Sequence, residues 1–234
     1  GTALIMGKKG QYVLTTAKDE VAVAQRRPTQ QLFGDPILAL KGVGVTIESG
    51  GLNEVSFDIR SGEIVGVAGL IGSGADELLE TLFGARPKVS GTVKVQGIEK
   101  ENLSPQNSVR DGVALIPADR KRVGLMMERS VSDNLSHVSV GGYKQGSTLL
   151  SKSALMATAT KLVEKFTIKA ENVNVRVGNL SGGNQQKVVI GKWLEIAPGL
   201  VLLDDPTRGV DIGAKVELFR LVREIAAEGK GILF

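Results

Sequence analysis

A glycine-rich loop follows an apolar run near the end of the first third of the chain. The loop has the sequence Gly69-Leu70-Ile71-Gly72-Ser73-Gly74-Ala75-Asp76 and leads into a segment with helical periodicity. Small residues in a strand-to-helix turn let backbone N–H groups point at phosphate oxygens at the start of the helix. We therefore predict a nucleotide-binding loop whose phosphate-facing residues are Gly69, Gly72, Ser73, Gly74, Ala75 and Asp76.

This loop lacks the two side chains that a G-x-x-x-x-G-K-[ST] phosphate loop uses. Ala75 stands at the lysine position and Asp76 at the serine or threonine position. The absent lysine removes a charge-assisted contact worth about 1.5–3 kcal/mol. A carboxylate about 4 Å from a phosphate costs about 1–4 kcal/mol unless Mg²⁺ bridges them. We expect weak nucleotide binding and no strong catalysis here. The alternative is a plain strand-to-helix turn.

Two acids follow a second apolar run, residues 200–203. An acid at the carboxyl end of a buried parallel strand faces the ligand crevice, so Asp204 is predicted to hold Mg²⁺ or its water. Asp205 is the candidate general base. Its carboxylate lies one methylene closer to the backbone than that of glutamate, and a misplacement of about 1 Å can cost about 10²-fold in rate. The alternative is a pair of acids that ends a strand before the turn at Pro206.

A third motif, Leu180-Ser181-Gly182-Gly183-Asn184-Gln185-Gln186-Lys187, lies between the loop and the two acids. A serine and two glycines at the start of a helix offer a hydroxyl and unobstructed N–H groups to an anion. The alternative for Ser181 is a simple helix N-cap. The alternative for Gln185, Gln186 and Lys187 is a solvent-facing helix.

Strands alternate with helices along most of the chain, which predicts a mostly parallel sheet flanked by helices. Strands are expected at residues 38–47, 53–59, 63–68, 113–116 and 200–203. Helices are expected at residues 76–83, ended by Gly84, at 152–169, and at 214–227. Residues 130–176 are expected to be mostly helical, and about 130–180 to form an insertion. Residues 1–36 are interpreted as a linker or the remnant of a preceding domain, and residues 37–234 as one domain.

The composition limits the classes of function. The chain has 234 residues, enough for one sizeable α/β domain, and no cysteine, which excludes disulfides and thiolate metal sites. No apolar run has the length of a membrane span. Aromatic residues make up 4% of the chain, which argues against a single-stranded nucleic-acid platform. Because the chain begins at Gly1 and ends in a strand-like run, we interpret it as a fragment of a longer protein.

From about Ile37 to Phe234 the chain resembles the second ATP-binding half of double-domain ATPases of carbohydrate ABC importers. The matching phrases are residues 62–70, 119–122, 180–187 and 204–215. The resemblance implies a P-loop NTPase-type α/β fold with an antiparallel β subdomain and a helical insertion. It implies ATP and Mg²⁺ as cofactors and a transport ATPase, weakly active or inactive alone, at the cytoplasmic face of the membrane. The implied partners are a second nucleotide-binding domain, membrane permease subunits and, indirectly, a periplasmic-type sugar-binding protein, without nucleic acid.

The resemblance also assigns roles to single residues. Residues 181–184, called the signature turn below, would close together with Gln185 over the γ-phosphate that the opposite domain holds. Asp211 would belong to the D-loop, which contacts the same opposite domain. The family's Q-loop glutamine would fall near Ala118, and its switch histidine would follow Phe234. The one histidine, His137, is expected to be a surface or packing residue, and Trp193 a core residue. The run Arg120-Lys121-Arg122 is expected to be a solvated face or to contact the coupling surface.

Ala75, Asp76, Ala118 and Asp205 depart from the residues that the family uses for catalysis. They predict an asymmetric protein, in which this half chiefly donates its signature turn to a working site built on the other half's loop. Three alternatives remain open. The protein can be a nucleoside importer of similar build, or a regulatory nucleotide-binding domain that never hydrolyses ATP. It can also be a DNA-repair or translation ATPase, which the low aromatic content and the dispersed net charge of +4 disfavour.

Overall fold

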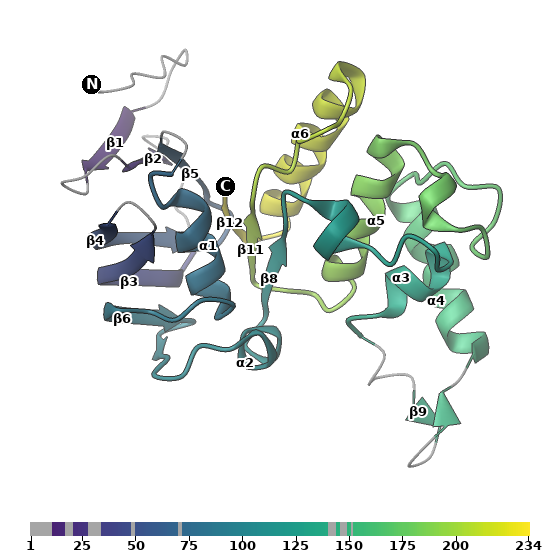
Figure 1. Cartoon of the computed structure of the whole chain (residues 1–234), viewed down its shortest axis with the longest axis horizontal. Coiled ribbons are helices and arrows are strands. Elements are labelled where there is room, and N and C mark those ends of the chain that lie inside the picture. The colour runs from purple at the N-terminus through teal and green to yellow at the C-terminus, as the bar shows by residue number, and fades with distance from the viewer. Residues whose placement is uncertain are drawn as a thin grey trace. The chain divides into compact units, whose positions relative to one another are not determined.

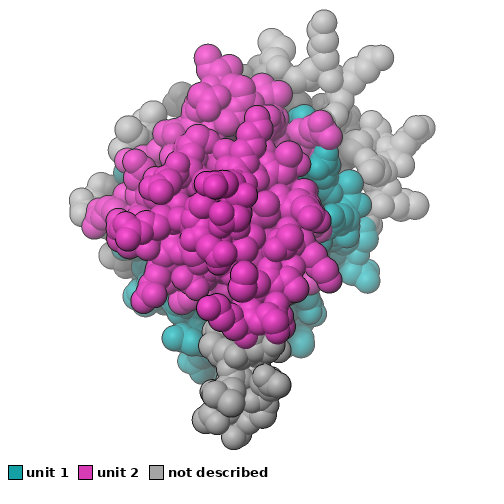
Figure 2. Space-filling view, turned by 90° about the vertical axis from the view of Figure 1, so that its right-hand side faces the viewer, with its two compact units in different colours: residues 1–115, 199–204, 221–234 teal, residues 116–198, 205–220 magenta. Residues whose placement is uncertain are grey.

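A computed structural model describes residues 11–16, 21–27, 34–47, 50–69, 72–139, 144–145, 149–150 and 152–234 (Figure 1). The chain divides into two units, which Figure 2 colours separately. Unit 1 contains residues 1–115, 199–204 and 221–234, and unit 2 contains residues 116–198 and 205–220.

A six-stranded sheet forms the centre of unit 1, with the strand order β1-β2-β5-β12-β11-β8. Strands β5, β12 and β11 run parallel to one another, as the alternation of strands and helices predicted. The residues of β11 and β12 are all buried, as are Val113, Ala114 and Ile116, which explains why the runs at residues 113–116 and 200–203 are continuously hydrophobic. The strands are β1 Gln11–Thr16, β2 Val21–Arg27, β5 Ile64–Gly69, β8 Val113–Ile116, β11 Leu200–Leu203 and β12 Gly231–Leu233.

The first two strands lie within residues 1–36, which the sequence predicted to be a linker or a domain remnant. β1 pairs with β2 in antiparallel fashion, and β2 pairs with β5 in the same way. This segment therefore extends the central sheet by a hairpin. The predicted domain boundary at residue 37 stays a prediction.

A single helix, α1 (Ala75–Phe83), follows the glycine-rich loop and contacts β3, β5 and β11. It buries Leu78, Leu79, Leu82 and Phe83, the face predicted from the helical period. Gly84 ends the helix in a left-handed conformation with φ 79°, because the turn requires a residue without the steric penalty of a side chain. The predicted helix at residues 76–83 is confirmed.

A second sheet in unit 1 is antiparallel throughout, with the order β4-β3-β6-β7. Its buried side chains include Leu38, Leu40, Val43, Val93 and Val95, which alternate with more exposed residues along the strands. This sheet is the antiparallel β subdomain that the sequence predicted. Its strands are β3 Pro36–Ile47, β4 Gly50–Arg60, β6 Ser90–Val95 and β7 Ile98–Glu99, and the short helix α2 (Pro105–Arg110) follows them.

Unit 2 is mainly helical. Helices α3, α4 and α5 pack on one another through buried apolar side chains such as Leu135, Ala159, Leu162, Val188 and Ile190. The elements are the π-helical turn η1 (Arg120–Gly124), α3 (Val131–Ser136), β9 (Lys144–Gln145), β10 (Leu149–Leu150), α4 (Lys152–Lys165), η3 (Val177–Asn179), α5 (Gly182–Leu194) and the first part of α6 (Ile212–Ala227).

The expectation of a mostly helical stretch at residues 130–176 is wrong for the short strands β9 and β10 and for the last eleven residues. After α4 the chain forms turns and extended backbone from Phe166 to Arg176. Backbone N–H groups of Val131 and Ser132 donate to the carbonyls of Val175 and Val173, so the segment is held against the start of α3 instead of continuing the helix. None of the described helices is both long enough and apolar enough to span a bilayer.

Helix α6 differs from its predicted amphipathic pattern. Leu218, Val222 and Ile225 are buried as expected, whereas Val216 is 65% exposed and Phe219 is 43% exposed. The period of 3.6 residues identified the helix, but it overstated the width of the buried face.

Candidate functional site

The glycine-rich loop and Asp204 lie at the same edge of the central sheet. β5 and β11 are both parallel to β12, which lies between them, so the carboxyl ends of the two strands point the same way. Gly69 ends β5, and Asp204 directly follows β11. In open α/β sheets, ligands bind outside the carboxyl ends of the strands. The topology therefore brings together the two predicted phosphate and metal elements of unit 1.

The loop keeps its predicted scaffold. Gly72 has φ 80° and Gly74 has φ 94°, conformations that favour glycine. Gly74 is the N-cap of α1 and supplies no side-chain cap, so the first N–H groups of the helix are not capped by it. Ser73 is buried. Leu70 and Ile71 lie outside the described residues.

The first turn of α1 carries its own negative charges. Asp76 and Glu77 both lie in this turn, where the positive end of the helix dipole stabilises carboxylates. An incoming phosphate would meet two like charges at the same helix end, and Ala75 provides no cation to offset them. The scaffold of a phosphate loop is therefore present without its charge complement.

Asp205 lies in a strained turn of unit 2. Its φ of 33° is rare for a residue other than glycine, a conformation that costs about 1–3 kcal/mol. Its carboxylate is exposed and accepts a hydrogen bond from the Thr207 hydroxyl at 3.1 Å. Strain of this kind is concentrated at functional turns. Its role as a general base stays a prediction, as does the role of Asp204 as a metal ligand.

The signature turn forms the start of α5, as predicted. Ser181 is the N-cap, and its hydroxyl accepts hydrogen bonds from the Asn184 backbone N–H at 3.4 Å and from the Asn184 side-chain amide at 2.9 Å. Ser181 is also exposed. The N-cap interpretation is therefore confirmed, and the exposed hydroxyl remains compatible with an anion contact.

The two glycines of the turn are required by close packing. A Cβ atom at Gly182 would lie 2.8 Å from Nη2 of Arg120 and 3.0 Å from the carbonyl oxygen of Gly209. A Cβ at Gly183 would lie 2.8 Å from the Cβ of Ala214 in α6. The two distances of 2.8 Å are too short for a Cβ atom, so the signature turn packs directly on η1 and on the chain that follows the two acids.

Two glutamines of the motif are buried, which corrects the interpretation of a solvent-facing helix. Gln185 is 4% exposed and Gln186 is 3% exposed. The side-chain amide of Gln185 donates to the Leu180 carbonyl at 2.9 Å, and its oxygen accepts from Nε of Arg120 at 3.4 Å. Gln185 therefore supports the turn from within unit 2, and its predicted contact with a partner domain stays a prediction. Only Lys187 reaches the surface, where it pairs with Glu217 at 2.8 Å.

Asp211 begins the last helix. Its carboxylate accepts a hydrogen bond from the Ala214 N–H at 2.9 Å, the geometry of an aspartate N-cap on α6. Asp211 is exposed, and the turn that precedes it contains Gly209 in a left-handed conformation with φ 64°. The predicted D-loop residue is thus an exposed cap whose position is fixed by α6.

The run Arg120-Lys121-Arg122 is not a uniform solvated face. Lys121 and Arg122 are exposed as predicted, but Arg120 is only 6% exposed. The Arg120 guanidinium donates to the carbonyl oxygens of Arg208 at 2.6 Å and Gly209 at 3.0 Å. Sequence analysis missed this residue because a charge run does not reveal which member points inward.

A family model described as "ABC transporter" matches residues 52–208. The chain belongs to the ABC transporter family. The matched range includes the glycine-rich loop, the signature turn and the two acids.

Curated relatives are import ATP-binding proteins. The ribose import ATP-binding protein RbsA 1 of Rubrobacter xylanophilus is 40% identical over 208 residues, which cover 89% of this chain and 41% of that protein. The galactose/methyl galactoside import ATP-binding protein MglA of Clostridium perfringens is 41% identical over 182 residues, covering 78% and 35%. The chain spans less than half the length of these relatives.

Solved structures establish the fold. A nucleotide-free ATP-binding cassette from an ABC transporter has a TM-score of 0.71 at 21% identity, covering 85% of this chain and 80% of that chain. The ADP conformation of another ATP-binding cassette has a TM-score of 0.69 at 22% identity, with coverages of 85% and 80%. The predicted α/β fold class is confirmed.

Three other residues that the sequence analysis singled out lie away from the signature turn and the glycine-rich loop or are only partly buried: His137, Trp193 and Ala118. His137 is exposed at the end of α3, in agreement with a surface residue. Trp193 is half-buried and not a core residue, and the Lys192 ammonium lies 5.8 Å from the centre of its ring. Ala118 is half-buried just before η1. Within the described part of the chain, no three His, Asp or Glu side chains gather as a metal site.

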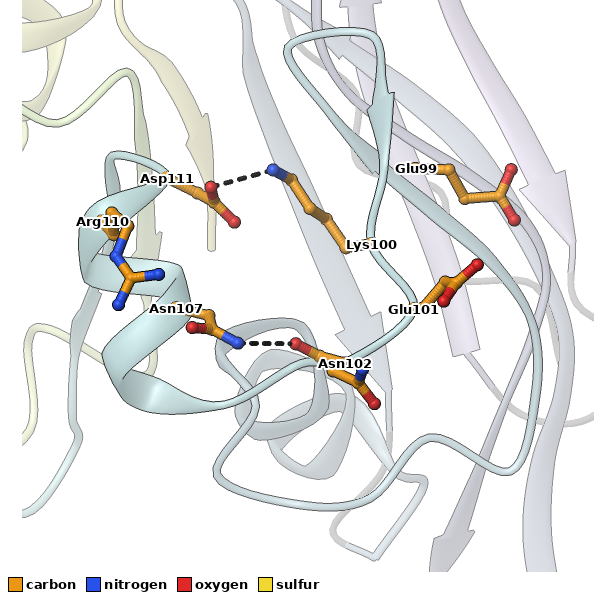
Figure 3. Close-up of a pocket in the computed structure, with 7 residues that line it drawn as sticks. All are labelled: Glu99, Lys100, Glu101, Asn102, Asn107, Arg110 and Asp111. Atoms are coloured by element: carbon orange, nitrogen blue, oxygen red, sulfur yellow. Dashed lines mark hydrogen bonds and ion pairs between the residues drawn. The ribbon is translucent and has the colours of Figure 1, made fainter.

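Unit 1 of the ABC domain also has an open polar pocket of about 620 Å³ beside α2 (Figure 3). Lys100 and Asp111 form an ion pair across it at 2.8 Å, and the Asn107 amide donates to the Asn102 carbonyl at 3.1 Å. None of its lining residues is a predicted site residue. We therefore assign this pocket no role in nucleotide binding.

Lys192 gives a pH-dependent prediction for the ABC domain. Desolvation by burial lowers the pKa of Lys192 to about 8, while its ammonium donates to the Gly124 carbonyl. Between pH 8 and about 10.4 the native lysine is neutral and the unfolded lysine is still protonated, so the unfolded state binds more protons and the free energy of unfolding rises with pH. The expected slope is at most about 1.4 kcal/mol per pH unit. Below pH 8 both states are protonated, and Lys192 contributes no slope.

Urea denaturation of the wild type and of Lys192→Met at several pH values measures this effect. The difference in unfolding free energy between the two proteins should change across this window and be constant below it. Because both proteins share all other titrating groups, the difference isolates Lys192. A pH-independent difference would contradict the prediction.

Proposed function

We propose that this domain is the second ATP-binding half of the ATPase subunit of a monosaccharide importer. The relatives' names support a sugar importer, since they include ribose and galactose import proteins. The phrase at residues 204–215 supported the same class from sequence alone. The subunit would act at the cytoplasmic face of the membrane, bound to permease subunits and served indirectly by a periplasmic-type sugar-binding protein.

The observation that carries the proposal is a contrast within one chain. The signature turn has all the residues of its motif, its helix is capped by Ser181, and its two glycines leave no space for a Cβ atom. The phosphate loop has its glycine scaffold but Ala75 and Asp76 at its two chemical positions. Such a domain is suited to donating its turn to a site on another domain, and poorly suited to hydrolysing ATP in its own pocket.

The working site would therefore combine residues of both halves. In it, the Ser181 hydroxyl and the N–H groups at the start of α5 would stabilise the charge that develops on the γ-phosphate. Asp211 and the turn before it would contact the partner domain.

The pocket of this half would be degenerate. Mg²⁺ bound with ATP needs only one or two protein carboxylates besides the phosphates, and Asp204, which directly follows β11, would supply one. When bound, the ion would neutralise phosphate charge. Asp205 would be a poor general base, since its short side chain bonds within its own turn.

Titration calorimetry of Mg-ATP into this domain tests the proposal. We expect little binding to the parent domain and clear binding to the double variant Ala75→Lys, Asp76→Thr, which restores the lysine and the hydroxyl. The lysine contact alone is worth about 1.5–3 kcal/mol, or about tenfold to 150-fold in affinity. Matching far-UV circular dichroism of the two proteins serves as the folding control. Tight binding by the parent would contradict a degenerate pocket.

A further inference from the structure

One buried arginine joins three segments of unit 2 that are far apart in the sequence. Arg120 donates through Nη1 to the Arg208 carbonyl at 2.6 Å and through Nη2 to the Gly209 carbonyl at 3.0 Å. Its Nε donates to Oε1 of Gln185 at 3.4 Å. Arginine has a rigid planar fork of five N–H donors, so one side chain can hold these acceptors in a fixed relative position.

Arg120 joins the signature turn to the turn at residues 207–211. In the proposed function, both turns contact the partner domain. Gln185 lies in the first turn of α5 and also holds the Leu180 carbonyl, directly before the signature turn. Gly182 has no room for a Cβ because Nη2 of Arg120 would lie 2.8 Å from it. The signature turn therefore rests directly on the guanidinium, which at the same time holds the chain at residues 208–209.

The arginine itself has little freedom. It begins η1, whose N-cap Asp119 accepts a hydrogen bond from the Arg122 N–H at 3.1 Å. The other end of η1 is bound to α5, because the Lys192 ammonium donates to the Gly124 carbonyl. With both ends of its turn fixed, Arg120 is a rigid support and not a mobile surface cation.

We propose that Arg120 is a positioning residue for ATP hydrolysis, which makes the signature turn and the turn at residues 207–211 move as one body. The functional part of this inference rests on the proposed function, since it takes both turns to face the other half. Without the fork, each turn would keep its own cap, through Ser181 and Asp211, but the two would no longer be aligned. Lysine cannot replace the arginine, because its single ammonium lacks the fork.

Hydrogen–deuterium exchange on the full-length subunit tests the physical part of the inference. The amides that report on it are Gln185, whose N–H donates to Ser181, together with Arg208 and Val210 in the second turn. In Arg120→Lys we expect at least about tenfold faster exchange in peptides covering both turns, with unchanged exchange in α1 and β11. The matched control is Arg122→Lys, which alters an exposed arginine two residues away and should leave exchange as in the wild type. Unchanged exchange in either turn would overturn the inference.

Steady-state ATPase kinetics of the same proteins test the functional part. We expect the kcat of Arg120→Lys to fall about 10–100-fold with little change in KM, and that of Arg122→Lys to match the wild type. In Arg120→Ala, added guanidinium ion at low millimolar concentration should restore part of the lost kcat, a rescue that a general folding defect would not give. Faster exchange with an unchanged kcat would overturn the role in hydrolysis. A wild-type subunit without ATPase activity would refute the proposed function, and the exchange experiment would still decide whether Arg120 couples the turns.

Discussion

Replacing Ser181 by arginine is expected to reduce the ATPase activity of the full-length subunit by at least about 10³-fold. Removal of one preorganised donor to a developing oxyanion costs about 10²–10³-fold in kcat. The arginine would in addition occupy the exposed space in front of the α5 start, where the proposed function places the γ-phosphate of the other half. Phosphate release under saturating Mg-ATP measures the effect.

A second N-cap serine in the same unit provides the control. Ser130 caps α3, accepting the Asp133 N–H at 3.0 Å, and belongs to no predicted site. Ser130→Arg therefore loses a helix cap, at a cost of about 1 kcal/mol in stability, without touching the signature turn. Its activity should stay close to that of the wild type. Equal losses in both variants would show that the effect is one of folding.

A substitution in the phosphate loop of this half should have a much smaller effect than Ser181→Arg. Ala75→Lys restores one side chain of the phosphate loop in this half, and we expect it to change the activity of the full-length subunit by less than about tenfold, a free-energy difference of about 1.4 kcal/mol. If instead Ala75→Lys strongly raised the activity and Ser181→Arg left it intact, the asymmetric assignment of the two sites would be wrong. A wild-type subunit with no activity would favour the non-hydrolysing regulatory domain.

The elements that the sequence predicted best are those with one dominant signal. The strands β8 and β11 have the predicted bounds because each apolar run is only four residues long, too short for a typical helix, and has glycine and proline close to its ends. Helix α5 begins directly after Ser181 because serine is a strong N-cap and its side chain has a partner at Asn184. Local chemistry alone determines both features, so no knowledge of tertiary contacts was needed.

The features that the sequence could not predict depend on which residues meet in space. Arg120 and Arg122 are the same residue type two positions apart, yet only Arg120 is buried, because the carbonyls of residues 208–209 accept its hydrogen bonds and Gly182 has no side chain beside it. The one available signal was the pair of glycines, which implied that some group approaches the signature turn closely. Its identity required the structure. In the same way, the left-handed conformation of Thr167 (φ 50°) and the bond from the Ile168 N–H to the Val163 carbonyl end the helix that was predicted to continue to residue 169.

Replacing Gly84 by alanine is expected to destabilise the domain by about 2–5 kcal/mol. Gly84 ends α1 with φ 79°, and an L-residue in this conformation costs about 1–2 kcal/mol. Its Cβ would also lie 2.3 Å from the backbone nitrogen of Ser104 and 2.6 Å from the carbonyl carbon of Leu103. Because these are backbone atoms, the chain before α2 must move, and overpacking of this kind adds about 1–3 kcal/mol. Urea denaturation followed by circular dichroism measures the total.

Gly97 separates the two contributions. It has nearly the same conformation, with φ 76°, in the turn between β6 and β7, but a Cβ there would have no atom within 4 Å. Gly97→Ala should therefore show the conformational cost alone, about 1–2 kcal/mol. A similar loss in both variants would mean that the segment before α2 yields without cost, and that α1 is not fixed by its contact with Ser104. A much larger loss at Gly84 would mean that the helix following the phosphate loop is anchored at its far end. The loop glycines would then be held by a rigid helix, even though the loop lacks the lysine and the hydroxyl residue that bind phosphate and Mg²⁺.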